Sequence, residues 1–229
     1  MARKILLTSV CRPLGPQFGA APSVGYELLY RQVLRAQGIF SPRTVNIHFG
    51  LEYIAENLDA PTVVLQYPSR RELIRELKKG YDYVGVSFLM AVMHRMKETV
   101  ALIRQYSPRS KIVLGGYGTV LKDDVLKPYA DYICREEGVA YFRRLLGEPE
   151  IPMPYKHPLI VSWLKLFGIK VSGTGKIFAG LGCPNGCDFC CTSHFFSRKH
   201  IKLLPGGKDI YAVVERYLDL DPRLVFLIL

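Results

Sequence analysis

The chain has 229 residues, 49% hydrophobic and 22% charged, so it is long enough to bury a core and its composition excludes wholesale disorder. Its 31 Lys and Arg outnumber its 20 Asp and Glu, which gives a formal charge of +11. The basic residues are scattered, so a nucleic-acid-binding protein is the weakest function class and no nucleic-acid partner is expected. No apolar run approaches the roughly 18 residues of a membrane helix. The N-terminus lacks the long apolar core of a signal peptide, so we expect a cytoplasmic protein.

Apolar runs alternate with amphipathic segments through residues 1–148. This alternation predicts a first α/β domain, a doubly wound parallel sheet of the flavodoxin or Rossmann type with helices on both faces. The predicted strands are 4–10, 43–48, 61–66, 82–88, 111–114 and 132–134. The predicted helices are 24–36 and 70–79, with Ser23 and Ser69 as N-caps, together with 51–58, 93–106 and 139–146. We expect a ligand site in the loops beyond the carboxyl ends of these strands.

The rest of the chain reads as a linker and the start of a second domain. Residues 149–158 contain four prolines, and a short amphipathic helix is predicted at 159–167, so residues 149–172 are assigned as linker and helix. In the second domain, 173–229, we predict a turn at 172–175, a strand at 176–179, a helix at 209–218 and an apolar strand at 224–229. That last strand would form an unprotected sheet edge.

Four of the six cysteines lie between residues 183 and 191. Cys183, Cys187 and Cys190 form a C-x3-C-x2-C pattern around the turn residues 184–186. Thiolates are the usual ligands of iron–sulfur clusters, and three ligands leave one iron of a four-iron cluster open to a small molecule. Zinc is the alternative, with His194 or His200 as a fourth ligand, and buried inert thiols are the third interpretation. The spacing favours a cluster over zinc and zinc over inert thiols.

Paired glycines and a serine mark the predicted sheet edge. Gly115 and Gly116 follow one strand, and Ser87 ends another. Such glycines either form a turn or let a flat ligand lie close to the backbone. We favour the second interpretation and take these three residues as candidate cofactor contacts.

The cysteine loop, with Phe189 just before its last cysteine, resembles the signature of radical S-adenosylmethionine enzymes. The stretches 63–68, 81–88, 113–119 and 134–139 are similar to the cobalamin-binding domain that precedes many of these enzymes. The resemblance implies that Cys183, Cys187 and Cys190 hold a 4Fe–4S cluster. It implies that S-adenosylmethionine binds the open iron with Phe189 near its adenine, and that an external electron donor starts its cleavage to a 5′-deoxyadenosyl radical. A small-molecule substrate would react with that radical, in many relatives with methyl transfer from cobalamin.

The sequence also departs from the family pattern. Many cobalamin domains carry a D-x-H-x-x-G loop after the first strand, but residues 9–16 contain no histidine. The usual G-E-G-E stretch is replaced by Arg135-Glu136-Glu137-Gly138. The 57 residues from Gly173 to Leu229 are far fewer than the roughly 250 of a complete (β/α)8 barrel. We therefore expect the first units of an incomplete radical S-adenosylmethionine barrel, a fragment of a longer protein, which does not cleave S-adenosylmethionine alone. The rival hypothesis is a non-catalytic α/β binding module with a zinc or vestigial metal loop.

Overall fold

The computed structural model of the protein describes residues 3–12, 48–166 and 169–229. These residues divide into two compact units. The first contains 3–12 and 50–150, and the second contains 48–49 and the described residues from 151 onward. The helix predicted at 24–36 with Ser23 as its cap, and the strand predicted at 43–48 except for His48, lie outside the described residues.

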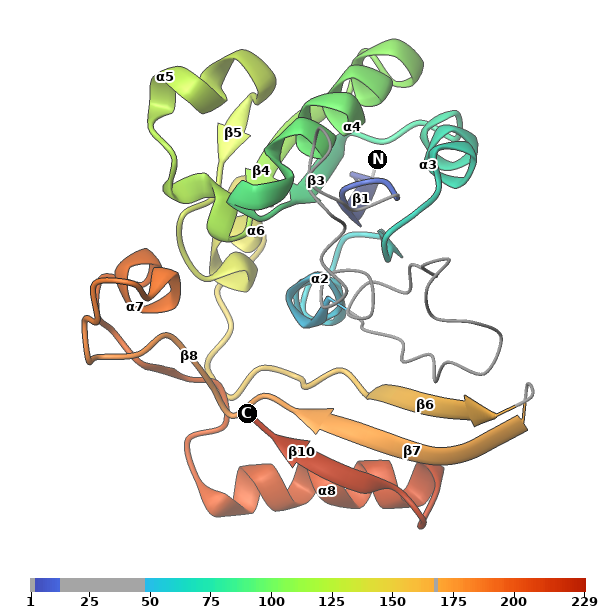
Figure 1. The fold of residues 1–229 in the computed structure, drawn as a ribbon, viewed down its shortest axis with the longest axis vertical. Helices are drawn as coiled ribbons and strands as arrows, with labels where there is room; N and C mark the ends of the chain where they lie inside the picture. The colour runs from blue at the N-terminus through green and yellow to red at the C-terminus, as the bar shows by residue number, and fades with distance from the viewer. Residues whose placement is uncertain (1–2, 13–47, 167–168) are drawn as a thin grey trace. The chain divides into compact units, whose positions relative to one another are not determined.

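The first unit contains a five-stranded parallel sheet in the order β2-β1-β3-β4-β5 (Figure 1). Its strands are β1 (Ile5–Ser9), β2 (Thr62–Leu65), β3 (Tyr83–Ser87), β4 (Lys111–Gly115) and β5 (Tyr132–Ile133). The consecutive residues Ile5, Leu6 and Leu7 are at most 1% exposed. Because successive strand residues point to opposite faces, burial of all three shows that both faces of the sheet are covered. The predicted parallel α/β sheet is confirmed.

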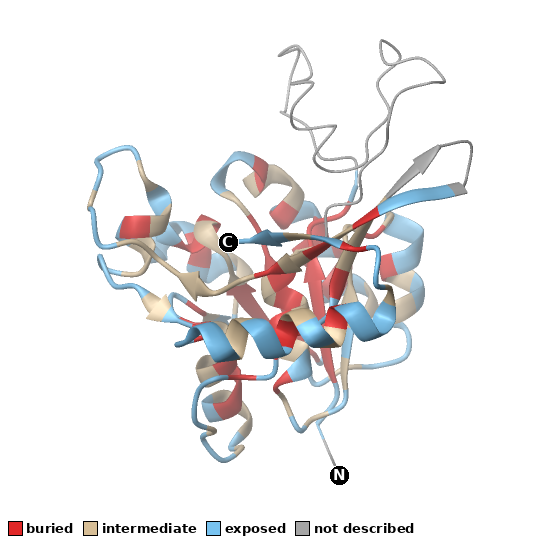
Figure 2. Cartoon of the chain, turned by 90° about the horizontal axis from the view of Figure 1, so that it is seen from below, coloured by how far each residue is buried: buried red, intermediate tan, exposed pale blue. Residues whose placement is uncertain are grey.

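Four longer helices of the first unit occupy predicted positions. They are α2 (Phe49–Glu56), α3 (Arg70–Leu77), α4 (Met93–Tyr106) and α6 (Gly138–Leu146). Ser69 caps α3 as predicted, because its hydroxyl accepts a hydrogen bond from the Glu72 N–H while the Glu72 carboxylate accepts one from the Ser69 N–H. Leu51 of α2 and Phe142 of α6 are buried in one cluster with Ile5, Leu7 and Val113 of the sheet. Figure 2 shows this concentration of buried residues on the strands and the inner sides of helices.

Four short elements of the first unit were not predicted from the sequence. They are the 3-10 turns η2 (Met90–Val92), η3 (Tyr117–Val120) and η4 (Lys127–Tyr129) and the one-turn helix α5 (Asp123–Leu126). Elements of three or four residues are too short to show a hydrophobic period, which explains why sequence pattern alone does not find them. Two of them, η2 and η3, follow β3 and β4 directly and therefore lie at the carboxyl edge of the sheet.

The second unit contains a three-stranded sheet in the order β10-β7-β6, formed by β6 (Ile160–Leu166), β7 (Ile169–Ile177) and β10 (Val225–Ile228). Helix α8 (Gly207–Leu220) connects β9 to β10, and its Val213 and Tyr217 are buried with Ile177 and Leu224. β10 pairs with β7 in parallel, whereas β6 pairs with β7 in antiparallel fashion. Strands β8 (Gly180–Leu181) and β9 (Ile201–Lys202) form a two-stranded ribbon. The chain between these strands contains the four clustered cysteines and the short helix α7 (Cys191–Phe195).

Two predictions for the second unit are wrong. The segment 159–167, predicted as a helix, forms strand β6. Its alternate residues Val161 and Trp163 pack against the hydrophobic cluster that contains Val213 and Tyr217 of α8, which is the two-residue period of a strand. The segment 172–175, predicted as a turn, lies inside strand β7. A Cβ at Gly173 would lie 2.8 Å from the Trp163 ring, and a Cβ at Gly175 would lie 3.1 Å from the Tyr217 ring. These glycines therefore admit large neighbouring side chains rather than turn the chain.

Acid should weaken the second unit through His157. This side chain is 1% exposed, its Nε2 accepts a hydrogen bond from the Phe178 N–H at 3.0 Å, and burial lowers its pKa from 6.5 to about 4. Between these two values the unfolded chain binds a proton that the folded chain does not, so stability falls as the pH falls. We expect a loss of about 1.4 kcal/mol per pH unit, about 3 kcal/mol in all. Urea unfolding at several pH values checks this; an equally steep profile in His157→Gln would contradict it.

Candidate functional site

The carboxyl edge of the parallel sheet aligns the ends of β1, β3 and β4. Ser9 is the register partner of Ser87, and Ser87 is the register partner of Gly115. The strand order places β1 between β2 and β3, so the direction of winding reverses between β1 and β3, and α/β sheets bind ligands at the carboxyl edge beside such a reversal. Two of the sequence-predicted contacts, Ser87 and Gly115, therefore lie side by side, and Gly116 follows directly.

Gly115, the last residue of β4, and Gly116, directly after it, differ in how much room their neighbours leave for a side chain. Gly116 has a φ of +81°, and a Cβ there would lie 2.6 Å from the Ser87 Oγ and 2.9 Å from the Phe88 carbonyl oxygen. The packing of the fold itself thus excludes a side chain at Gly116. At Gly115 the φ is ordinary for a side chain, and among the described residues an added Cβ would meet one atom, the Cys134 Cβ at 4.0 Å. The described residues therefore leave open space beside the Gly115 backbone, and their packing does not explain the glycine.

Polar contacts hold the loops around this open space. The Thr119 hydroxyl is buried and lies 2.8 Å from the Gly116 carbonyl oxygen and 3.1 Å from the Cys134 carbonyl oxygen, so it links the ends of β4 and β5. Ser9 Oγ accepts a hydrogen bond from the Tyr67 N–H at 2.7 Å, and Tyr67 has a φ of +45°. Sequence reasoning missed these roles of Ser9 and Tyr67, because a positive φ at tyrosine has no sequence signal.

Arg135, which replaces the first glycine of the usual G-E-G-E stretch, is tied to neighbouring loops. Its guanidinium donates to the Thr119 carbonyl at 2.7 Å and the Leu121 carbonyl at 2.9 Å, and it pairs with the Asp123 carboxylate at 2.6 Å. The hydrogen bond from Arg135 holds the pKa of Asp123 below its usual value. The Arg135 guanidinium is therefore bound by η3, by the residue after it and by α5.

The last two residues of that stretch, Glu137 and Gly138, have structural roles. The Glu137 carboxylate is buried and accepts hydrogen bonds from the Val139 N–H at 2.7 Å and the Ala140 N–H at 2.9 Å, so it caps α6. Burial raises the pKa of Glu137. A Cβ at Gly138 would lie 2.4 Å from the end of the Ile54 side chain, so the absence of a side chain at Gly138 lets α2 pack closely against α6.

The cysteine loop lies between β8 and α7. Cys183 and Cys190 are half-buried, Cys187 and Cys191 are exposed, and all four are free thiols. The loop is bent at Gly182, with a φ of +82°, and at Gly186, with a φ of +70°. Within the described residues no three His, Cys, Asp or Glu side chains form a group ready to hold a metal ion, so the structure places the three predicted ligands on one loop without converging their sulfurs. The donor set itself, three thiols on one bent loop, suits a soft metal centre.

The remaining cysteines and the loop phenylalanine contrast in exposure. Cys11 and Cys134 are buried, and burial raises the pKa of Cys11 and raises that of Cys134 to about 12. These two thiols stay protonated and act as core residues. Phe189 has 92% of its surface exposed, which leaves its ring available to a ligand or partner.

The comparisons with known proteins bear on the first unit. Residues 40–146 match the family model of the B12 binding domain. The match covers β2 to β5 and therefore includes Ser87, Gly115 and Gly116, whereas β1 and the cysteine loop lie outside it. No curated protein matches the chain.

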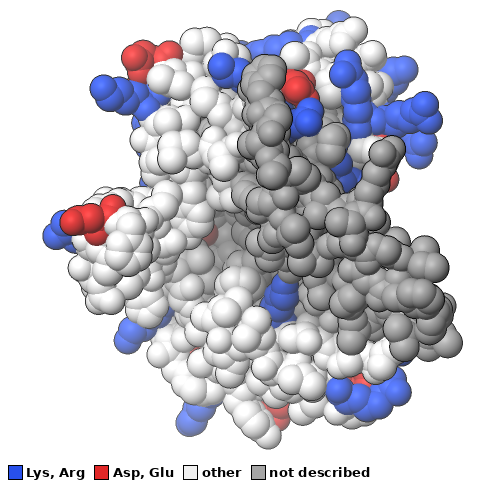
Figure 3. Space-filling model, viewed as in Figure 1, with Lys and Arg blue, Asp and Glu red and all other residues white. Residues whose placement is uncertain are grey.

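Among the described residues, no helix combines the length and apolar character needed to span a bilayer. Figure 3 shows Lys and Arg spread over the visible face rather than gathered in one stripe.

Proposed function

We propose that the first unit binds cobalamin at the carboxyl edge of its sheet. The observation that carries this proposal is the open space that the described residues leave beside Gly115, at the carboxyl edge of a parallel sheet whose strands β2 to β5 match the B12 binding domain. Gly115 lets the cofactor approach the backbone at the end of β4, and Ser87 offers a hydroxyl on the neighbouring strand. The described part of the loop after β1 holds Cys11 and Arg12, and the sequence supplies no histidine there, so this loop gives cobalt no imidazole ligand.

The residues of the first unit position cobalamin and shield it. Val10 and Phe88, which directly follow β1 and β3, are at most 3% exposed and pack into the fold at this edge, while Thr119 fixes the loop after β4. Bound cobalamin would supply an alkyl group carried on cobalt, and the protein's own contribution is binding, orientation and exclusion of water.

Filling the open space at Gly115 should weaken cobalamin binding without weakening the fold. Gly115→Leu places a side chain where the fold leaves room, so we expect a Kd for hydroxocobalamin raised by about tenfold or more, the equivalent of 1–2 kcal/mol of overpacking. The thermal midpoint should not fall, because a strand glycine adds no packing of its own. Gly207→Leu is the matched control, since no atom of the described residues lies within 4 Å of the Gly207 Cβ position, and Gly207 lies at the start of α8. Equal Kd values for the two variants would contradict the proposal.

We further propose that the cysteine loop of the second unit holds a 4Fe–4S cluster through Cys183, Cys187 and Cys190. The spacing of the three cysteines and their position on a loop bent at two glycines support this assignment. When bound, the cluster would supply the electron that cleaves S-adenosylmethionine, with the electron drawn from an external donor and the radical acting on a small-molecule substrate. Phe189, exposed in the loop, would contact the adenine. The whole would then be a cobalamin-binding radical S-adenosylmethionine protein.

Anaerobic reconstitution with iron and sulfide tests the cluster. We expect a brown protein with about four iron atoms and four sulfides per chain. A colourless chain that retains one zinc ion would instead support a non-catalytic binding module with a zinc loop, and the cluster assignment would then be wrong.

A further inference from the structure

The turn that follows α7 packs directly on the cysteine loop. Ser197 and Arg198 have φ values of +52° and +58°, an arrangement that reverses the chain toward β9. A Cβ at Gly182 would lie 2.1 Å from the Lys199 carbonyl oxygen, so this turn touches the start of the cysteine loop. Backbone strain at two consecutive non-glycine residues persists only where the surroundings hold it.

Ser193 links three segments of this region. Its side chain is fully buried, although the loop around it is largely exposed. Its Oγ donates a hydrogen bond to the Cys183 carbonyl oxygen at 2.8 Å and accepts one from the Gly186 N–H at 2.9 Å. Its own carbonyl oxygen accepts a hydrogen bond from the Arg198 N–H at 2.8 Å. One serine thus fixes the first half of the cysteine loop and anchors the turn behind it.

The side chain of Arg198 lies across the middle of the cysteine loop. A Cβ at Gly186 would lie 2.6 Å from Nε and 2.9 Å from Cζ of Arg198, so the guanidinium lies directly against this glycine. Gly186 lies between Cys183 and Cys187, the first two predicted ligands. In the described parts of the chain no carboxylate pairs with Arg198. Its positive charge is therefore available to the loop.

We propose that Ser193 and Arg198 are positioning residues of the thiolate site, an inference that rests on the proposed metal-binding role of the loop. Ser193 holds the backbone bend between Cys183 and Gly186, which separates the first two proposed ligands. Arg198 offsets part of the negative charge that three thiolates bring to one centre. Groups around a metal's ligands that orient or balance them commonly change its affinity by 10–100-fold.

Cadmium binding to the reduced, metal-free full chain tests the proposal, because cadmium–thiolate bonds absorb in the ultraviolet and need no cluster assembly. We expect Ser193→Ala and Arg198→Gln each to weaken Cd²⁺ binding by about tenfold or more. Thr192→Ala removes a neighbouring hydroxyl, Lys208→Gln removes a charge at the start of α8, and both should bind as wild type. Arg198→Lys should retain most of the affinity. The effect of Arg198→Gln should shrink at high salt, whereas that of Ser193→Ala should not.

The outcomes separate the two levels of the proposal. Wild-type affinity in both Ser193→Ala and Arg198→Gln, with Cd²⁺ bound through three thiolates, would overturn the positioning roles and leave the metal site standing. Failure of the wild-type chain itself to form cadmium–thiolate bonds would overturn the metal site and the inference with it. If Ser193→Ala loses its fold by circular dichroism, Arg198→Gln decides, since Arg198 is exposed and its replacement leaves the core intact.

Discussion

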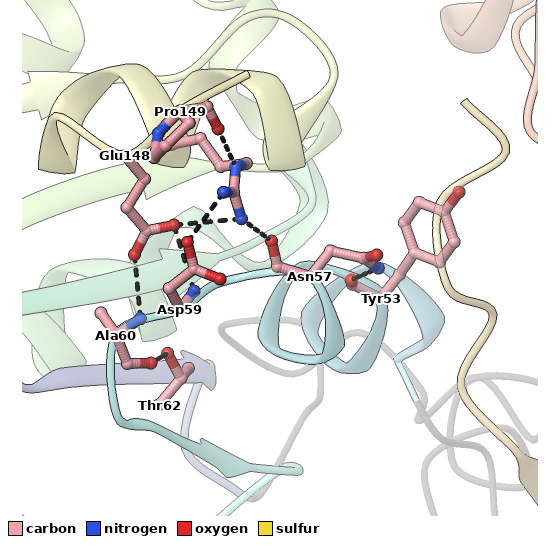
Figure 4. Close-up of polar contacts among 8 residues, drawn as sticks. Tyr53, Asn57, Asp59, Ala60, Thr62, Glu148 and Pro149 are labelled. Carbon is pink, nitrogen blue, oxygen red and sulfur yellow. Dashed lines mark hydrogen bonds and ion pairs between the residues drawn. The ribbon is translucent and has the colours of Figure 1, made fainter. Parts of the chain in front are cut away.

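Replacing Arg143 with alanine is expected to lower the free energy of unfolding of the first unit by about 3 kcal/mol. Arg143 is 4% exposed, and its guanidinium donates to the Asn57 carbonyl at 2.8 Å and the Pro149 carbonyl at 2.5 Å (Figure 4). It also pairs with the Asp59 carboxylate at 2.9 Å and the Glu148 carboxylate at 3.3 Å. One side chain of α6 thus joins the end of α2, the segment before β2 and the chain that leaves the unit.

The cost arises because removal of the arginine leaves a buried carboxylate without its cation. The Glu148 side chain is only 11% exposed, although it still accepts hydrogen bonds from the Asp59 N–H at 3.1 Å and the Ala60 N–H at 2.9 Å. Those two bonds and the exposure of Asp59 place the estimate at the lower end of the range for a broken buried pair.

The adjacent arginine supplies the control for that measurement. Arg144 pairs with Glu136 at 2.6 Å, but both side chains are about half exposed, so Arg144→Ala should cost less than about 1 kcal/mol. Urea unfolding followed by circular dichroism compares the two variants. Similar losses in Arg143→Ala and Arg144→Ala would show that the buried network does not stabilise the unit as argued.

Replacing any one of Cys183, Cys187 or Cys190 with alanine is expected to abolish iron binding. With two thiolates left, the loop lacks a third anchor for a four-iron cluster. Cys191→Ala should retain about the wild-type iron content, because Cys191 begins α7 directly beside a proposed ligand and neighbouring side chains rarely reach one centre. Iron and sulfide analysis after anaerobic reconstitution decides the matter. Loss of iron in Cys191→Ala together with retention in Cys187→Ala would show that the ligands are wrongly assigned.

Hydrophobic pattern predicted the parallel sheet because its strands are nearly continuous apolar runs, such as Ile5–Ser9, between capped amphipathic helices. It failed for β6, which was predicted as an amphipathic helix, and for β7, where Gly173 and Gly175 look like turn residues. Their actual role, admitting the rings of Trp163 and Tyr217, depends on contacts between segments distant in sequence.

The candidate site was predictable in place but not in detail. The topology of a parallel sheet brings Ser87 next to Gly115, as strand order alone implies. The sequence does not distinguish Gly115 from Gly116, because they are adjacent glycines after one predicted strand, and the difference between them lies in φ and in their neighbours in space. Ser193 was missed for a related reason: a serine near cysteines shows no pattern, and its role depends on burial and two hydrogen bonds.

The most direct test of the cobalamin site is a titration of the full chain with hydroxocobalamin, with wild type, Gly115→Leu and Gly207→Leu measured side by side. Our account predicts saturable binding of one cobalamin per wild-type chain, unchanged binding in Gly207→Leu, and binding weakened by about tenfold or more in Gly115→Leu at an unchanged thermal midpoint. Absence of saturable binding by the folded wild-type chain, or equal affinity in all three proteins, would contradict it.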